Sequence, residues 1–195
     1  LYDPSADNWN AYDQVWDLRF REANTSCPYT YAPADWDYFS AAWQAKAQGY
    51  LQNCGNFFVY GENSGFPAKF QGVSTFLNTI GAPTGLNTCN GPTGDAYQDS
   101  PATLTSTLPG TTQLYTWAYG GIPLSKLNGT SFVTQNFSSD SVDRSVAAGW
   151  SGSAQMGSIG GTSCNIGRLF TLWDQSMWQG DKYTGGGKTI TDTLF

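Results

Sequence analysis

Residues 35–55, which read DWDYFSAAWQAKAQGYLQNCG, carry the clearest secondary-structure pattern of the chain. Large or apolar side chains recur there at three- and four-residue steps, the spacing of one face of an α-helix. They are Trp36, Phe39, Trp43, Ala47, Tyr50 and Cys54. Asp35 can cap the first turn, and Gly55 supplies a residue that ends the helix. The stretch therefore predicts an amphipathic helix that stops at Gly55.

The segments on either side predict two further helices. In the segment from Trp9 to Glu22, aromatic residues keep the same spacing, with charged residues elsewhere on the cylinder. After the central helix, Pro67 can open a third one, which Gly81 would end. Its apolar side would consist of Phe66, Phe70, Val73, Leu77 and Ile80.

From Pro83 onwards the sequence is rich in Gly, Ser, Thr and Pro, and short alternating runs favour strands. Residues 113–119 alternate most regularly, and 131–137, 166–173 and 188–194 are weaker strand candidates. Residues 140–162 contain few large apolar side chains, so we expect a surface loop there, interrupted by a short helix near 142–148.

These elements predict one α+β domain over residues 1–195. A helical N-terminal half, residues 1–82, would pack against a Gly/Ser/Thr-rich antiparallel β and loop half, residues 83–195. The length of 195 residues is enough for one domain with a real core, and each half alone would bury little surface.

Composition excludes several kinds of chemistry. The chain has no histidine, so it offers no Ser-His or Cys-His nucleophile pair and no His-ligated metal or haem. Its net charge is −6 and its nine basic residues are scattered, which excludes the basic stripe of a nucleic-acid or membrane-surface protein. We expect no cofactor, no metal, no nucleic acid and no membrane partner, and a monomer. Carboxylates remain as the catalytic groups.

The four cysteines predict two disulfides, because their spacing is wide and histidine ligands for zinc are missing. Three pairings are possible, and proximity favours Cys27 with Cys54 and Cys89 with Cys164. Asparagines in glycosylation sequons stand at Asn24, Asn128 and Asn136. Together these features predict a secreted, extracellular glycoprotein.

Glu62 is the main candidate for a catalytic residue. It is the only acid between Asp37 and Asp95, and it directly follows the run Asn56-Phe57-Phe58-Val59-Tyr60-Gly61. An acid shielded from water by aromatic rings has a raised pKa, as the general acid of a glycosidase needs. The alternative is a loop carboxylate that accepts backbone hydrogen bonds or lies in water.

Three other acids are weaker candidates. Asp95 could line a cleft as a second carboxylate, although turn chemistry alone is the more common reason for an acid in such a stretch. Asp37 fits as a first-turn charge of the central helix, and Glu22 as an ion-pair partner of Arg19.

Eight Trp and eleven Tyr residues suggest a sugar ligand, since flat rings and amide side chains suit pyranose rings. We expect exposed platforms from the strand face of residues 113–119 and from Trp150; the alternative is that these rings cover the core. The candidate binding residues are Tyr60, Tyr115, Trp117, Tyr119 and Trp150.

Two short segments resemble the lysozyme-like glycoside hydrolases and lytic transglycosylases. They are Glu62-Asn63-Ser64-Gly65-Phe66 and Gly81-Ala82-Pro83-Thr84-Gly85-Leu86, which together span about 25 of 195 residues. In that family a catalytic Glu at a helix end precedes Ser-Gly-Phe and a Gly-Ala-x-Gly-Leu stretch. The chain departs from it by an Asn after the Glu and by an extra residue before Gly85. The resemblance implies an α+β glycosidase with Glu62 as the acid.

Two main functions therefore remain open, beside the less favoured alternative of a disulfide-stabilised cell-wall protein without a cleft. The first is a secreted hydrolase that acts on a β-linked polysaccharide, with Glu62 as acid and Asp95 or Asp37 activating water. The second is a non-catalytic carbohydrate-binding or host-interaction protein that uses the same aromatic residues.

Overall fold

The computed structural model describes residues 6–18, 40–63, 66–82, 85–86, 102–105, 107, 113–116, 120–152, 155–157 and 166–173. Its elements in chain order are the 3₁₀ helix η2 (Trp9–Ala11), β1 (Gln14–Asp17), α1 (Ala41–Gln52), β2 (Asn56–Tyr60), α2 (Pro67–Ile80), β3 (Ala102–Thr105), β4 (Gln113–Thr116), β5 (Ile122–Pro123), β6 (Thr130–Asn136), β7 (Asp143–Ser151) and β8 (Arg168–Leu172).

A mixed sheet organises the described part of the chain. Its strand order is β1-β2-β8-β7, with β6 and the short β5 both paired to β7. The pairs β1/β2 and β2/β8 are parallel, whereas β7 is antiparallel to β8, β6 and β5. Strands β3 and β4 form a separate antiparallel pair. The fold is thus a mixed α/β arrangement, and strands from the N-terminal half take part in the main sheet.

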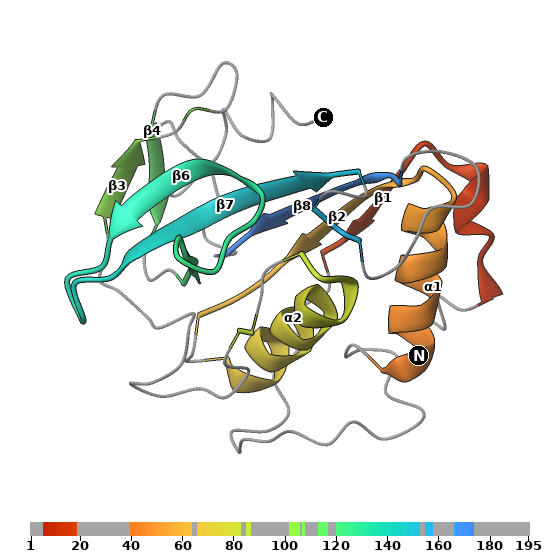
Figure 1. Cartoon of the computed structure of the whole chain (residues 1–195), viewed down its shortest axis with the longest axis horizontal. Coiled ribbons are helices and arrows are strands. Elements are labelled where there is room, and N and C mark those ends of the chain that lie inside the picture. Colours follow the sequence, from red (N-terminus) through yellow and green to blue (C-terminus); the bar gives the residue numbers. More distant parts are fainter. Residues whose placement is uncertain are drawn as a thin grey trace.

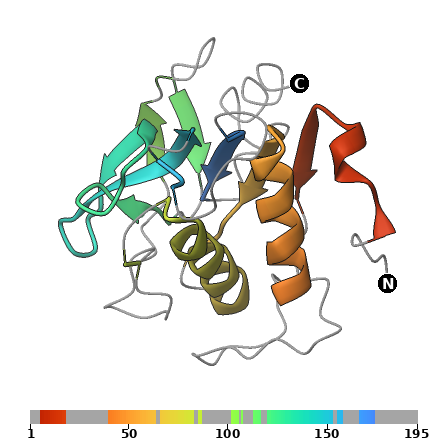
Figure 2. The same ribbon diagram turned by 45° about the vertical axis from the view of Figure 1, so that its right-hand side comes forward.

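Both helices cover one face of this sheet (Figure 1, Figure 2). The chain moves from β1 to β2 past α1 and from β2 towards β8 past α2, in the same direction across the sheet. Crossovers of constant right-handed sense put successive helices on the same side when the chain keeps moving in one direction. The opposite face of β1, β2 and β8 is therefore not covered by either helix.

The main core lies between the helices and the sheet. It contains Trp43 and Leu51 of α1, Phe76 of α2, and Phe57 and Val59 of β2, all buried. The Trp43 ring packs edge-on against Phe76 at 5.1 Å, and its indole Nε1 donates a hydrogen bond of 2.8 Å to the buried carboxylate of Asp17. This bond joins α1 to β1.

The helix predicted around Trp43 is confirmed, with different ends. Ser40 caps it, since its hydroxyl accepts a hydrogen bond from Trp43 N, and Asp35 lies outside the described residues. The helix ends at Gln52. Cys54 then has a left-handed φ of 72°, and Gly55 N donates a hydrogen bond of 2.9 Å to Tyr50 O. A Cβ on Gly55 would lie 2.3 Å from the Tyr50 ring, which explains the glycine.

The helix predicted after Pro67 is also confirmed. Pro67 is its first residue, and Gly81 ends it with a left-handed φ of 72°. The strands predicted at 131–137 and 166–173 are present as β6 and β8, and β4 covers 113–116 of the strand predicted at 113–119. The strand predicted at 188–194 lies outside the described residues.

The helix predicted from Trp9 to Glu22 is wrong where the structure describes it. A 3₁₀ turn and strand β1 occupy this region, and residues 19–22 are not described. Trp9 stacks on Phe57 in the helix-side core at 5.7 Å, whereas Trp16 stacks on Phe58 on the opposite face at 4.6 Å. The aromatic residues whose spacing suggested one face of a helix thus lie on two opposite faces of the sheet.

The surface loop predicted at 140–162, with a helix near 142–148, is also wrong. Residues 143–151 form β7, a central strand in which Arg144 to Ala148 are buried. Small side chains are sufficient there because neighbouring strands fill the space. The buried Arg144 is neutralised by Asp140, whose carboxylate accepts bonds of 2.7 and 2.6 Å.

Cys54 is the cysteine that the described residues include, and it is disulfide-bonded. Cys27, Cys89 and Cys164 lie outside these residues, so the predicted pairing stays a prediction. Neither described helix is long and apolar enough to cross a membrane.

Candidate functional site

The face of the sheet opposite the helices carries a row of aromatic rings. Trp16, Phe58 and Phe170 occupy matching positions on β1, β2 and β8. The ring centroids of Trp16 and Phe58 lie 4.6 Å apart, and those of Phe58 and Phe170 lie 5.5 Å apart, with nearly parallel planes in both pairs. Phe132 of β6 extends the row, 5.7 Å from Phe170.

A glycine on β7 makes room for this last ring. Gly149 is paired with Phe170 of β8, so a side chain at Gly149 would stand next in the row. A Cβ at this position would lie 2.9 Å from Cε2 of Phe132. The ring of Phe132 therefore covers the space above β7, and the row crosses five strands with four rings.

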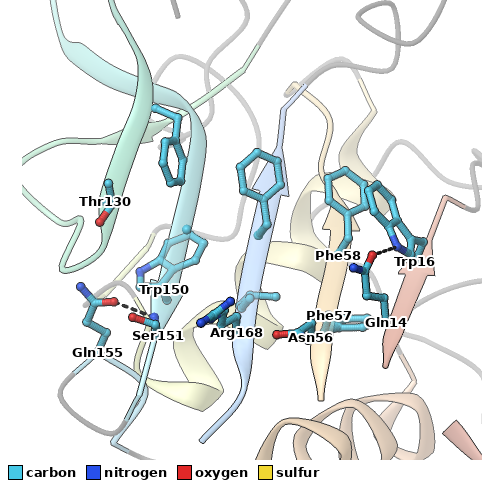
Figure 3. Close-up of a pocket in the computed structure, with 14 residues that line it drawn as sticks. Gln14, Trp16, Asn56, Phe57, Phe58, Thr130, Trp150, Ser151, Gln155 and Arg168 are labelled. Atoms are coloured by element: carbon cyan, nitrogen blue, oxygen red, sulfur yellow. Dashed lines mark hydrogen bonds between the residues drawn. The ribbon is translucent and has the colours of Figure 1, made fainter. Parts of the chain in front are cut away.

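A second row, made of polar side chains, runs beside the aromatic one. Gln14, Asn56, Arg168 and Ser151 are paired in sequence across β1, β2, β8 and β7. The first three lie two residues from a ring of the aromatic row, and Ser151 lies two residues from Gly149, so all four point to the same face. Figure 3 shows these four side chains in a line across the strands.

Hydrogen bonds hold part of the polar row. Gln14 Oε1 accepts from Trp16 Nε1 at 3.1 Å, and Asn56 Nδ2 donates to the carbonyl of Asp13 at 3.0 Å. At the other end Ser151 N donates to Gln155 Oε1 at 2.7 Å. Arg168 is exposed, and its guanidinium makes no hydrogen bond or ion pair with another described residue.

The two rows form the floor of a groove of about 500 Å³. This volume is in the range of small-molecule sites. We call it the sheet-face groove; its described lining is Gln14, Trp16, Asn56, Phe57, Phe58, Thr130, Phe132, Gly149, Trp150, Ser151, Gln155, Arg168, Leu169 and Phe170. Arg168 is the only ionisable side chain in this set, and no carboxylate belongs to it.

A short sequence signal underlies the groove, and the sequence analysis missed it. The triplets Gln14-Val15-Trp16, Asn56-Phe57-Phe58 and Arg168-Leu169-Phe170 each read polar, apolar, aromatic. Because the three strands pair in parallel and in register, the polar residues lie side by side and so do the aromatic residues. β7 runs the other way, so its Gly149 and Ser151 meet Phe170 and Arg168 in reverse order. The repeated triplet could have indicated three neighbouring strands.

Glu62 is placed away from the described lining of the groove. It follows β2 and is 1% exposed, and Asn63 N donates to its Oε2 at 3.4 Å. It lies four residues beyond Phe58, which is at most about 13 Å of extended chain. Glu62 is thus shielded from water, as the sequence predicts, but it is not among the described lining residues of the sheet-face groove.

Two predicted sugar-binding residues are buried, although one of them, Trp150, is also among the lining residues of the sheet-face groove. Tyr60 is 2% exposed, and the Lys69 ammonium lies 4.4 Å from its ring centroid. Trp150 is also 2% exposed; its ring lies in the helix-side core, and its Nε1 donates to Asn128 Oδ1 at 3.1 Å. The prediction that Trp150 is an exposed platform is wrong, because alternation along β7 turns its ring towards the helices.

The remaining predicted site residues cannot be brought into this geometry. Tyr115 belongs to β4, where it pairs with Thr103, but its side chain is not described. The following lie outside the described residues: Glu22, Asn24, Asp37, Asp95, Trp117 and Tyr119. Within the described ranges, acids and cysteines do not form a group of three or more that could hold a metal ion.

The two described sequon asparagines use their side-chain amides for internal hydrogen bonds. Asn128 Nδ2 donates to the carbonyls of Gly81 and Gln155, at 2.9 and 3.2 Å. Asn136 Nδ2 donates to Asp143 Oδ1 at 2.7 Å. Glycosylation at these positions stays a prediction.

Comparison with known proteins finds no matching family model, curated protein or solved structure. The functional argument therefore depends on the groove itself.

Proposed function

We propose that this protein binds a carbohydrate chain in the sheet-face groove without cleaving it. The observation that carries the proposal is the pair of rows, aromatic beside polar, repeated from strand to strand. Such a floor is complementary to a ligand that is itself both apolar and hydroxyl-rich along its length, as a polysaccharide is.

The spacing of the rows supports a ligand with a regular repeat. Neighbouring rings lie 4.6, 5.5 and 5.7 Å apart. This distance follows from the spacing of strands in a sheet, about 4.8 Å. It is close to the length of one sugar residue in an extended β-linked chain, so successive residues would meet successive ring and amide pairs.

The orientation of the rings supports an oxygen-rich ligand. Trp16 stacks on Phe58 and Phe58 stacks on Phe170, so part of each ring face is covered by its neighbour. Ring edges carry a partial positive charge. Hydroxyl and ring oxygens are complementary to these edges and to the amide N–H groups of the polar row.

Trp16 provides the test of binding. It stands at the end of the row and is half-buried, so we expect ligand to change its fluorescence. Calorimetric titration with mannan, chitosan, xylan and β-glucan oligosaccharides should detect binding to at least one of them. Trp16→Ala should weaken that binding about tenfold, the equivalent of one lost aromatic contact.

The matched control is Tyr12→Ala. Tyr12 is 63% exposed and is not part of the groove lining, so this variant should bind like the wild type. Equal weakening by both variants, or no binding to any glycan, would overturn the proposal. Reducing-sugar release from any of the polysaccharides would overturn its non-catalytic part.

Hydrolysis, with Glu62 as the acid, is the competing proposal. Its specific support is the burial of Glu62, at 1% exposure, directly after an aromatic strand. It has less support than binding, since a glycosidase needs two carboxylates beside the sugar and the described lining contains none. Glu62→Gln with intact folding should abolish sugar release if hydrolysis is correct.

A further inference from the structure

The charge of the sheet-face groove points to the class of glycan it takes. Arg168 opens β8 in the middle of the polar row, between Asn56 on one side and Ser151 on the other. It is the only ionisable group among the described lining residues. The chain as a whole carries a net charge of −6, whereas the described lining of the groove carries one positive charge and no negative one.

Arg168 is also available to a ligand. Its side chain is exposed and has no hydrogen-bond or ion-pair partner among the described residues. The other charged arginine of the sheet, Arg144, is in the opposite situation: it is 3% exposed and doubly hydrogen-bonded to Asp140. One arginine thus serves the fold, and the other faces the groove.

From these observations we infer that the groove binds an acidic polysaccharide whose sugar residues carry carboxylate groups. This inference rests on the proposed carbohydrate-binding function. The planar guanidinium of Arg168 matches a carboxylate with two parallel N–H···O bonds. The amide of Asn56 on the neighbouring strand offers a further donor.

The test compares two forms of one polymer. Polymannuronate is β-1,4-linked and carries free carboxylates, and its methyl-esterified form has the same backbone without the charge. In calorimetric titration we expect the wild type to bind the free-acid oligosaccharide about tenfold more tightly, the equivalent of one charged hydrogen bond. This preference should decline with added salt.

Variants connect the preference to Arg168. Arg168→Gln should remove this preference, so that the two polymer forms bind equally, and Arg168→Lys should retain only part of it, since an ammonium lacks the planar fork of the guanidinium. Lys126→Gln is the control, because it removes one positive charge at a residue that does not line the groove. It should retain the full preference.

The outcomes separate this inference from the proposed function. Equal binding of both polymer forms, sensitive to Trp16→Ala, would overturn the acidic-glycan inference and leave carbohydrate binding intact. A preference that survives Arg168→Gln would also overturn it, as would tighter binding of a sulfated β-glucan than of polymannuronate. No binding of either form, nor of any neutral glycan, would overturn both.

Discussion

Gly167→Ala should destabilise this protein strongly, because Gly167 lies against the backbone at the end of α1. A Cβ at this position would be 1.8 Å from the carbonyl oxygen of Gly55 and 3.0 Å from the carbonyl carbon of Cys54. Gly167 N also donates to Leu51 O at 2.7 Å, and Arg168 N donates to Gly55 O at 3.2 Å. The clashing atoms are backbone atoms, so rotation of a side chain cannot relieve the contact.

The magnitude follows from the overpacking involved. Insertion of one methyl group into a tightly packed site costs about 1–3 kcal/mol, and the rigid partner places this site at the upper end, about 3 kcal/mol. For a chain of this size each kcal/mol shifts Tm by roughly 2–4 °C. We therefore expect Gly167→Ala to lower Tm by about 6–12 °C.

Gly49→Ala is the matched control and should have the opposite sign. Gly49 lies inside α1, and a Cβ there would meet no atom within 4 Å. Alanine in a helix interior is more stable than glycine by about 0.5–1 kcal/mol, so Tm should rise by about 1–4 °C. Differential scanning calorimetry of both variants gives the comparison. A Tm for Gly167→Ala at or above the wild-type value would refute the packing described here.

Three further predictions concern individual contacts. Hydrogen bonds from Arg144 lower the pKa of Asp140, so this pair contributes stability above the unfolded carboxyl pKa of about 3.9 and loses it as pH falls through the folded value; the Tm difference between wild type and Asp140→Asn should be constant near neutral pH and shrink in acid. Trp43→Phe should cost about 1–3 kcal/mol in chemical denaturation, because it removes the indole donor to the buried Asp17 carboxylate; no change would mean that another donor replaces it. Gly149→Val should abolish glycan binding, since the new side chain would displace the ring of Phe132, which belongs to the edge strand β6; an unchanged affinity in titration would contradict the ring arrangement.

Local signals were enough to predict the two helices that cover the sheet. Pro67 and Gly81 delimit α2 by backbone chemistry alone, and the spacing around Trp43 identifies the buried side of α1. In the structure α1 begins at Ala41, because the hydroxyl of Ser40 caps its first turn. Such features depend on residues close in sequence, which is why they can be inferred without tertiary context.

The sheet could not be predicted in the same way, because its strands depend on partners far along the chain. β1 is only four residues long and its aromatic spacing also fits a helix. β7 consists largely of small residues, and its central position becomes clear only when β6 and β8 pair on either side. The groove was missed for the same reason: no single strand contains it, and Phe132, Phe170 and Arg168 come together only through register.

The close contact between Gly167 and Gly55 also helps to place the charged residue of the groove. Arg168 follows Gly167 directly, and the hydrogen bond from its backbone N–H to Gly55 O sets β8 in register with Asn56. The backbone of Arg168 is therefore held by the junction between α1 and β8, which belongs to the packed fold. Because an arginine on a fixed backbone loses less entropy on binding than one on a mobile loop, this junction strengthens the selectivity expected of Arg168. It follows that a displacement of β8 should weaken acidic-glycan binding even where Arg168 itself is unchanged.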